Sequence, residues 1–269
     1  MVNHVERAYR AWPILVSRAE EDSAAITYGD LAAQIGIHHR AIRYVLSVVQ
    51  DYCMQEGLPP LTILAVNAET GNPGHGFIAW DMDDLERGRA EVSAFRWADF
   101  ENPFVFAADG TTEGDLVREL VKRPATAKDV YARIRVRGML QVVFRKALLR
   151  VYQGRCAICG LSFEDALEAA HLIPWNEASP QERMDPANGI LLCATHHKLL
   201  DAGQITITRS GRIEYCDPDG TNGPYSASDK SISLNLHRKR AFLPAASNHR
   251  PSEEALAHHH RVHKWGDLA

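Results

Sequence analysis

Two pairs of metal-binding side chains stand out in the sequence because the spacing within each pair is short. Cys156 and Cys159 form a Cys-x₂-Cys pair, and Cys193 and His196 form a Cys-x₂-His pair. Two such pairs are typical of a tetrahedral structural zinc site, since one tight turn can present both ligands of a pair to the same ion. The alternative is a set of unconnected core residues. We favour a structural Zn²⁺, because a closed set of four ligands is rarer by chance than a lone Cys-x₂-Cys.

A second group of polar residues lies between and just after these pairs: His171, Asn188 and His197. Hydrolysis of a phosphodiester needs a base for water, an electrophile for the phosphoryl oxygens and stabilisation of the leaving oxygen. His171 titrates near neutrality and can take a proton from water, and one divalent ion, Mg²⁺ or Mn²⁺, can polarise the phosphate. A histidine taken alone is more often a core or surface residue. The joint spacing inside a zinc-bound segment favours catalysis.

Three strings carry a resemblance to a known family: Leu-Glu-Ala-Ala-His-Leu-Ile-Pro-Trp at 167–175, Asn-Gly-Ile-Leu-Leu at 188–192 and His-Lys-Leu-Leu-Asp-Ala-Gly at 197–203. They resemble the motif of the HNH endonucleases of the bacterial restriction type, and the resemblance extends over roughly residues 131–269. It implies a ββα-metal fold with His171 as general base. It also implies that Asn188 orients the turn and approaches the catalytic metal, and that His197, nine residues later, is a ligand of that metal.

The sequence departs from the family at one position. Many members carry an aspartate directly before the base histidine, where it binds the catalytic metal, whereas this chain has Ala170. Glu168 lies two residues earlier and so on the same strand face, and Asp185 and Asp201 are further candidates for the second ligand. Ala170 also supports an alternative function, that of a zinc-stabilised, non-catalytic DNA-binding protein with a degenerate HNH site.

Charge is distributed unevenly along the 269 residues, whose net charge is −4. Residues 1–130 contain 12 Lys and Arg against 20 Asp and Glu, whereas residues 131–269 contain 18 against 14 and nine of the 13 histidines. Such asymmetry indicates two domains, of which the basic one is better suited to a polyanion. We place a DNA-recognition domain at residues 1–125 and the endonuclease domain at residues 126–269.

The N-terminal half shows the outline of a helix-turn-helix: a short helix ending at Gly36, followed by a longer one from about His39 to Gln55. A strand is expected at 61–66. This half resembles the N-terminal domains of modification-dependent restriction enzymes and, weakly, a winged helix. Arg40 and Arg43 are expected to contact phosphate.

A sensor of 5-methylcytosine or 5-hydroxymethylcytosine needs a pocket for a flipped base or apolar contacts to the added group. Four aromatic residues either line such a pocket or form the core: Phe77, Trp80, Phe95 and Trp97.

The predicted fold class is therefore α+β, with a helix-turn-helix or winged-helix-like domain followed by a zinc-stapled ββα-metal domain. A basic helix over 129–152 and Lys198 are expected to attract DNA, with Arg145 and Lys146 as contacts on the helix. A hairpin is expected at 204–215, turning at Ser210-Gly211.

The chain has no apolar run of the length of a membrane span and no signal-peptide pattern, so we expect a cytoplasmic protein without a membrane partner. Double-stranded DNA, with modified cytosine as the expected target, is the predicted partner, and cutting both strands favours a homodimer.

Overall fold

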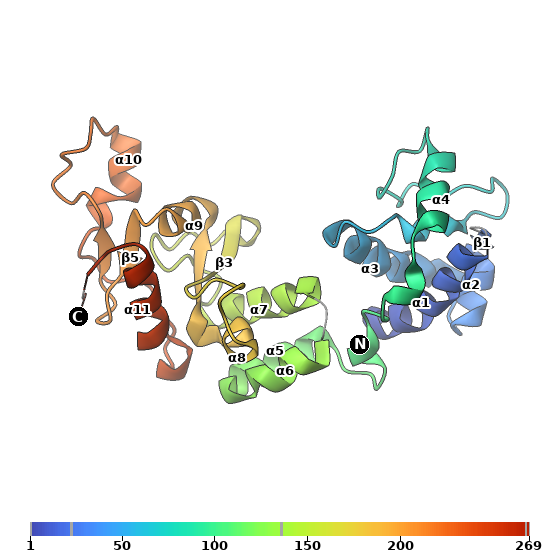
Figure 1. Ribbon diagram of the computed structural model, residues 1–269, viewed down its shortest axis with the longest axis horizontal. Helices are drawn as coiled ribbons and strands as arrows, with labels where there is room; N and C mark the ends of the chain where they lie inside the picture. Colours follow the sequence, from blue (N-terminus) through green and yellow to red (C-terminus); the bar gives the residue numbers. More distant parts are fainter. Residues whose placement is uncertain (1, 22–23, 135–136, 267, 269) are drawn as a thin grey trace. The chain divides into compact units, whose positions relative to one another are not determined.

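The computed structural model describes the chain apart from residues 1, 22–23, 135–136, 267 and 269 (Figure 1). The chain divides into two compact units, Met1–Thr112 with Ile134–Gly138, and Glu113–Arg133 with Met139–Ala269. Within the described ranges, no helix combines the length and the apolar character needed to cross a membrane.

The first unit is mainly helical and contains one small sheet. Its regular elements are α1 (His4–Glu20), β1 (Ile26–Thr27), α2 (Tyr28–Gln34), α3 (Ile42–Gln55), β2 (Ala65–Val66) and α4 (Leu85–Ala94). The core forms where α1 packs on α3. Trp12 of α1 lies edge-on to Tyr52, Trp97 and Phe104, at centroid distances of 5.6, 5.9 and 5.9 Å. Trp97 is thus a core residue.

The two helices expected in this unit are confirmed. The side chain of Thr27 caps α2 by accepting a hydrogen bond from the backbone N–H of Asp30. Gly36 follows α2 with φ of +67°, a backbone conformation that glycine adopts at little cost. A short 3₁₀ turn then leads into α3, which ends at Gln55. The small sheet pairs β1 with β2 in parallel and is not the antiparallel hairpin of a wing.

The strand expected at 61–66 is largely wrong. Leu61–Leu64 form a 3₁₀ turn, and only Ala65–Val66 are extended. The N–H of Ile63 donates to the carbonyl of Pro60 at 2.8 Å, so this stretch makes turn bonds in place of strand pairing. All six residues are buried, and an apolar run buried on every side carries no alternation by which strand and turn could be told apart.

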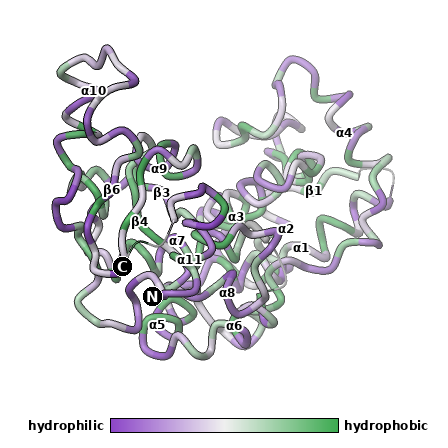
Figure 2. The backbone as a smooth tube through the Cα atoms, turned by 60° about the vertical axis from the view of Figure 1, so that its left-hand side comes forward, coloured by the Kyte–Doolittle hydropathy of each residue, from purple (hydrophilic) through white to green (hydrophobic). Residues whose placement is uncertain are grey.

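The second unit packs helices around two antiparallel strand pairs. Its elements are α5 (Glu113–Lys122), α6 (Ala127–Ile134), α7 (Arg137–Val151), β3 (Leu167–His171), α8 (Pro180–Met184), β4 (Gly189–Cys193), α9 (Ala194–Asp201), β5 (Ile205–Ile207), β6 (Ile213–Tyr215), α10 (Ala227–Ile232) and α11 (Glu253–Val262). β4 is among the hydrophobic segments drawn green in Figure 2, and all five of its residues are buried. The β5–β6 hairpin confirms the one expected around Gly211, whose φ is +78°.

Two features of this unit differ from the sequence expectations. The basic helix expected over 129–152 is found as α6 and α7, on either side of residues 135–136, which lie outside the described residues. The boundary between the compact units falls at Glu113. The boundary expected between the recognition and endonuclease domains was 125/126, and this division of functions stays a prediction. α5 is fastened within the second unit, because Glu113 pairs with Lys146 and the carbonyl of Val121 accepts a hydrogen bond from His249.

Candidate active site

The site is built on a ββα framework. β3 and β4 pair antiparallel, so that His171 at the end of β3 lies opposite Gly189 at the start of β4, and α9 follows β4 directly. A Cβ added to Gly189 would lie 2.6 Å from the ring of Phe144 on α7. Glycine therefore lets α7 approach the strand pair, and this approach brings Phe144 against His171.

The imidazole of His171 is held from three sides. Its ring stacks on Phe144 at 4.1 Å between centroids and 12° between planes, and Trp175 lies edge-on at 5.7 Å. Its Nε2 lies 3.0 Å from the carbonyl oxygen of Arg183. A carbonyl only accepts hydrogen bonds, so Nε2 carries the proton and the neutral ring keeps its lone pair on Nδ1. This tautomer is the one that a general base at Nδ1 requires.

The surroundings of His171 also disfavour its charged form. Burial lowers the pKa of the His171 imidazole below its usual value, and the nearby His197 acts in the same direction, whereas the Arg183 carbonyl acts against them. The neutral ring therefore predominates at neutral pH. In this form the ring can accept a proton from water.

Arg183 fixes the loop that supplies this carbonyl. Its Nε donates to the carbonyl of Trp175 at 2.9 Å, and its Nη1 donates to the hydroxyl of Tyr131 at 2.8 Å. The helix that carries it, α8, begins with a capping box between Ser179 and Glu182. The hydrogen-bond acceptor of His171 is thus held by a network that extends to α6.

Asn188 joins the two arms of the β3–β4 connection. Its Oδ1 accepts a hydrogen bond from the N–H of Ile173 at 2.8 Å, and its Nδ2 donates to the carbonyls of Ile173 and Glu182 at 3.2 and 3.1 Å. The side chain is 3% exposed. These bonds correspond to the positioning role expected for Asn188, while its role as a metal ligand stays a prediction.

His197 lies between two carboxylates. Its Nδ1 is 2.5 Å from Oε2 of Glu168 on β3, and its Nε2 is 3.6 Å from Oδ1 of Asp201, one turn along α9. The His197 side chain is 23% exposed and that of Glu168 is 46% exposed, so water and a substrate phosphate can reach them. Oxygen and imidazole donors suit Mg²⁺, Mn²⁺ and Zn²⁺, and a cation could take the place of the proton that Glu168 and His197 share.

The residue before His171 contributes no donor atom to the set around His197. Ala170 is fully buried within β3. Of the three carboxylates considered from the sequence, Glu168 and Asp201 both face His197, whereas Asp185 accepts a hydrogen bond from the N–H of Ala187 at 2.8 Å as a local cap. Glu168 thus offers the carboxylate that the Asp-to-Ala departure removes.

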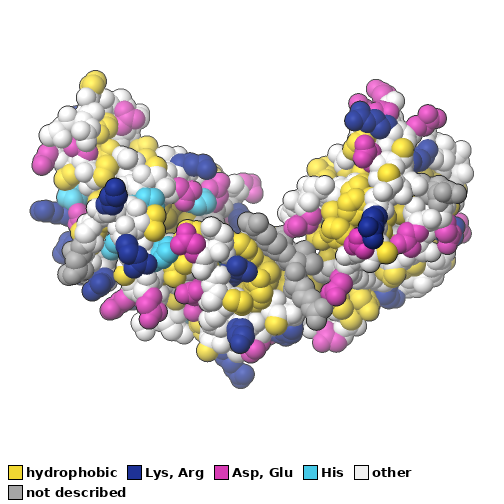
Figure 3. All heavy atoms as spheres, in the orientation of Figure 1, with side chains coloured by type: hydrophobic (Ala, Val, Ile, Leu, Met, Phe, Trp, Pro, Cys, Tyr) yellow, Lys and Arg dark blue, Asp and Glu magenta, His cyan; other side chains and the backbone are white. Residues whose placement is uncertain are grey.

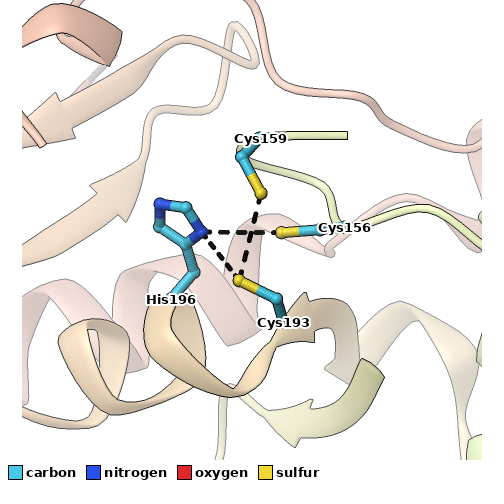
Figure 4. Close-up of side chains that lie close together, drawn as sticks. All are labelled: Cys156, Cys159, Cys193 and His196. Carbon is cyan, nitrogen blue, oxygen red and sulfur yellow. Dashed lines mark hydrogen bonds between the residues drawn. The ribbon is translucent and has the colours of Figure 1, made fainter. Parts of the chain in front are cut away.

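A second donor set surrounds His196, the residue next to His197. The ligand atoms of Cys156, Cys159, Cys193 and His196 all lie within 4.8 Å of one another (Figure 4). Nδ1 of His196 is 3.1 Å from the sulfur of Cys193 and 3.7 Å from that of Cys156. Three soft sulfurs and one imidazole nitrogen are the composition of a closed structural zinc site. This cluster could hold zinc.

Within this cluster the thiol pKa values shift in both directions, since that of Cys156 is lowered whereas those of Cys159 and Cys193 are raised. The hydrogen bond with Cys193, and to a smaller extent that with His196, hold the pKa of the Cys156 thiol well below its usual range. Nε2 of His196 donates to the carbonyl of Ile232 at 3.0 Å, which leaves Nδ1 free to face the sulfurs. Such an outer bond fixes ring orientation and tautomer in metal-binding histidines.

Of the residues expected to contact DNA, three have internal partners, one of them Arg43, which donates a hydrogen bond to the Tyr44 hydroxyl at 2.6 Å. Arg145 donates to the carbonyls of Leu167 and Glu164 at 3.2 and 2.8 Å, so its guanidinium supports the start of β3. Lys146 pairs with Glu113. Lys198 is exposed, one residue after His197 on α9. Arg40 and Arg43 are exposed in the first unit.

Comparison with known families agrees with this geometry. Residues 156–208 match the family model described as HNH endonuclease. This segment is an HNH endonuclease domain. It includes the Cys₃His cluster, both strands and the helix of the ββα framework, and every residue assigned above to the base and to the cation donors. No curated protein matches the chain.

The sequence analysis missed the part that α11 plays beside the HNH domain. A cavity of 280 Å³ is lined by His171 and Asp201 and also by His258 and His263 from α11 and the turn after it. Histidine side chains gather on this unit in Figure 3. His258 Nε2 lies 3.2 Å from a carboxylate oxygen of Glu177. The run of three histidines in the sequence was the available signal, but a run alone does not show which element faces it.

Proposed function

We propose that the protein is a metal-dependent DNA endonuclease that hydrolyses phosphodiester bonds at the HNH domain. The observation that carries this proposal is the arrangement around one ββα framework. A neutral histidine with a defined tautomer ends β3, and a carboxylate–histidine pair links β3 to α9. The HNH endonuclease match over residues 156–208 supports the same reaction.

In this mechanism His171 accepts the proton of the attacking water on Nδ1. The Arg183 carbonyl keeps the proton on Nε2 and so keeps Nδ1 available, while Phe144 fixes the ring plane. Because the pKa of His171 is lowered, the ring gives its proton up to solvent readily after each turnover. Asn188 holds the connection that carries Ile173, two residues after the base.

Glu168 and the Nδ1 of His197 would hold the divalent ion, Mg²⁺ or Mn²⁺, while Asp201 lies beside Nε2 on the other side of the ring. When bound, such an ion polarises the phosphate and stabilises the leaving oxygen. Glu168 supplies a carboxylate and His197 a ring nitrogen, and Asp201 adds a second carboxylate nearby. The exposed Lys198 beside them is placed to meet the DNA backbone.

The first unit is proposed to select the target. Arg40 and Arg43 are its expected phosphate contacts, near the start of α3, the longer helix of a helix-turn-helix-like pair. The proposed target is double-stranded DNA carrying 5-methylcytosine or 5-hydroxymethylcytosine, as in a restriction enzyme. Cleavage of both strands would require two active sites, and hence a homodimer.

Digestion of matched plasmids tests both levels of this proposal. Unmodified, methylated and hydroxymethylated plasmids are incubated with the protein and Mg²⁺ or Mn²⁺. Cutting that requires the ion supports the endonuclease, and a preference for either modified plasmid supports the target. Equal cutting of all three removes the modification and keeps the nuclease. DNA binding without cleavage in either ion would contradict the nuclease and favour the non-catalytic DNA-binding protein.

A further inference from the structure

The first unit contains a pocket that the proposed cleavage chemistry does not use. Its volume is 610 Å³, within the range of about 300–1,000 Å³ that is typical of small-ligand sites. It lies between the start of α2, the face of α3 and the loop at residues 74–77. Hydrophobic side chains reach the surface beside α3 in Figure 3. The pocket belongs to one compact unit.

Hydrogen bonds hold one wall of this pocket in place. The hydroxyl of Tyr28 accepts a bond from the N–H of Gly74 at 2.7 Å. The side chain of Gln50, only 5% exposed, donates to the carbonyl of Gly76 at 3.3 Å and accepts from the N–H of Ile78 at 3.0 Å. The loop is therefore fixed on α2 and α3, and the pocket is formed before any ligand arrives.

One buried polar group lines the pocket without a partner. Thr62 is 4% exposed, and among the described residues its hydroxyl makes no hydrogen bond. An unmade hydrogen bond at a buried hydroxyl destabilises the folded state. A ligand that completes this bond would remove the cost, and the hydroxyl would then contribute to recognition.

The other lining groups define the class of ligand. Tyr28, Tyr44 and Phe77 line the pocket with aromatic side chains, and the Tyr44 ring also contacts the ring of His4. Arg40 and Arg43 add positive charge, and the guanidinium of Arg43 lies over the Tyr44 ring at 4.6 Å. This local charge stands out, because residues 1–130 carry a net charge of −8. Aromatic side chains, hydrogen-bonding groups that include the Thr62 hydroxyl, and cations alongside fit a nucleobase attached to phosphate.

We propose that this pocket binds a nucleobase extruded from duplex DNA, with Thr62 bonding to the base edge, Tyr44 and Phe77 flanking the ring, and Arg40 and Arg43 holding the backbone. The proposal rests on the proposed function only in taking DNA as the target. A duplex base must leave its stack to enter a pocket, and a mismatched base leaves at lower cost than a paired one. Binding to a mismatch therefore reports on extrusion without any cleavage.

The test measures binding of the full chain carrying His171→Ala, without added Mg²⁺ or Mn²⁺. The probes are two short duplexes of one sequence, one fully paired and one with a single mismatched cytosine, with 2-aminopurine beside that cytosine. We expect roughly tenfold tighter binding to the mismatched duplex and a rise in 2-aminopurine fluorescence as the neighbouring base unstacks. Equal affinity for both duplexes, with no rise in fluorescence, would overturn the proposal.

Variants assign the effect to the pocket. Thr62→Val keeps the shape of the side chain and removes the hydroxyl, and Tyr44→Ala alters a residue that is 47% exposed and so of small weight in folding. Both should bring the mismatched-to-paired affinity ratio toward one. Phe100→Ala removes an exposed aromatic ring elsewhere in the unit and should leave the ratio unchanged. A ratio that Thr62→Val and Tyr44→Ala both leave intact would place extrusion elsewhere and contradict the proposal.

Competition with free deoxycytidine monophosphate tests whether the pocket binds a nucleotide within DNA or a free nucleotide. If the pocket reads DNA, the free nucleotide competes weakly and the duplex preference persists. Tight binding of the free nucleotide, lost in Thr62→Val, together with no duplex preference would make the pocket an effector site and overturn the proposal. Because the binding assay involves no cleavage, a failure of the nuclease in the plasmid assay leaves this result readable.

Discussion

His196 and His197 are neighbours in the sequence and in α9, yet they face two different donor sets. His196 is 1% exposed and faces three cysteine sulfurs, whereas the side chain of His197 is 23% exposed and faces two carboxylates. Successive residues in a helix point about 100° apart, so one helix can serve both sides. The comparison teaches that the surroundings, and not the residue type, place one histidine in a closed cluster and its neighbour in an open one.

The largest expected effect concerns the closed site. Cys193→Ser should abolish zinc retention and unfold the HNH domain, because structural zinc contributes apparent folding free energies of about 10–16 kcal/mol in zinc-finger peptides. Zinc content and thermal unfolding are the measurements. Cys216→Ser is the matched control, since Cys216 is exposed and bonds only to Gln204 among the described contacts. A stable, active Cys193→Ser protein would break the comparison on its structural side.

Separate replacement of His196 and His197 by alanine tests the comparison between the two donor sets. His197→Ala should keep zinc and the melting temperature and reduce cleavage by roughly a hundredfold or more, because it removes a donor for the ion that stabilises charge in the transition state. The His196→Ala variant should lose zinc, and any loss of cleavage should follow from the loss of zinc. The prediction fails if the two variants lose zinc and activity in parallel.

Two carboxylates, that of Glu168 on β3 and that of Asp185 in the β3–β4 connection, test the donor set around His197. Glu168→Gln should raise the Mg²⁺ or Mn²⁺ concentration needed for half-maximal cleavage by about tenfold or more, since an amide is a poorer ligand for a hard cation. Asp185→Asn should leave that concentration unchanged, because asparagine can still cap the turn at Ala187. Equal responses of the two variants would remove Glu168 from the donor set.

The pH dependence of cleavage follows from His171. Its pKa is lowered by burial, and the base works only when neutral, so activity should rise with pH and level off at a pH below the ordinary histidine value of about 6.5. Single-turnover rates between pH 5 and about 8 measure this, with zinc content checked at each pH. A rising limb centred above about 6.5 would contradict a buried neutral base.

A further expected effect concerns stability and not cleavage, and it lies in α11, whose His259 bonds to the carbonyl of Leu200 on α9. Burial lowers the pKa of His259 to about 4, and its ring bonds to Thr206 and to the carbonyl of Leu200. Its neutral form is favoured in the folded state, so its contribution is intact above about pH 6.5 and is lost as pH falls toward 4, by up to about 3 kcal/mol. Urea unfolding of wild type and His259→Gln across this range measures it, and identical acid limbs would contradict the assignment.

Much of the HNH domain is predictable from the sequence because its signals are local. Two ligand pairs with short spacing and the strings around His171, Asn188 and His197 indicate the ββα framework, and the structure has this framework at β3, β4 and α9. The partner of His197 is less predictable. Glu168 lies 29 residues away in the sequence, and only the strand register brings it to α9.

Other features depend on contacts that no local pattern records. Arg145 and Lys146 read as a free basic face, yet their partners are the start of β3 and Glu113, which come from distant parts of the sequence. The pocket of the first unit combines a tyrosine of α2, residues of α3 and a buried threonine of the 61–64 turn. Of the four aromatic residues considered from the sequence, Phe77 lines the pocket and Trp97 lies in the core.

The central claim is that His171 acts as the base of a metal-dependent nuclease on a framework that zinc holds in shape. Its most direct test is the single-turnover cleavage rate of duplex DNA by wild type and His171→Ala at saturating Mg²⁺ or Mn²⁺. Zinc content and melting temperature are measured on the same samples. The account predicts a rate loss of roughly 10²–10⁴-fold with zinc and folding unchanged. Equal rates for the two proteins, or no cleavage by wild type in either ion, would contradict it.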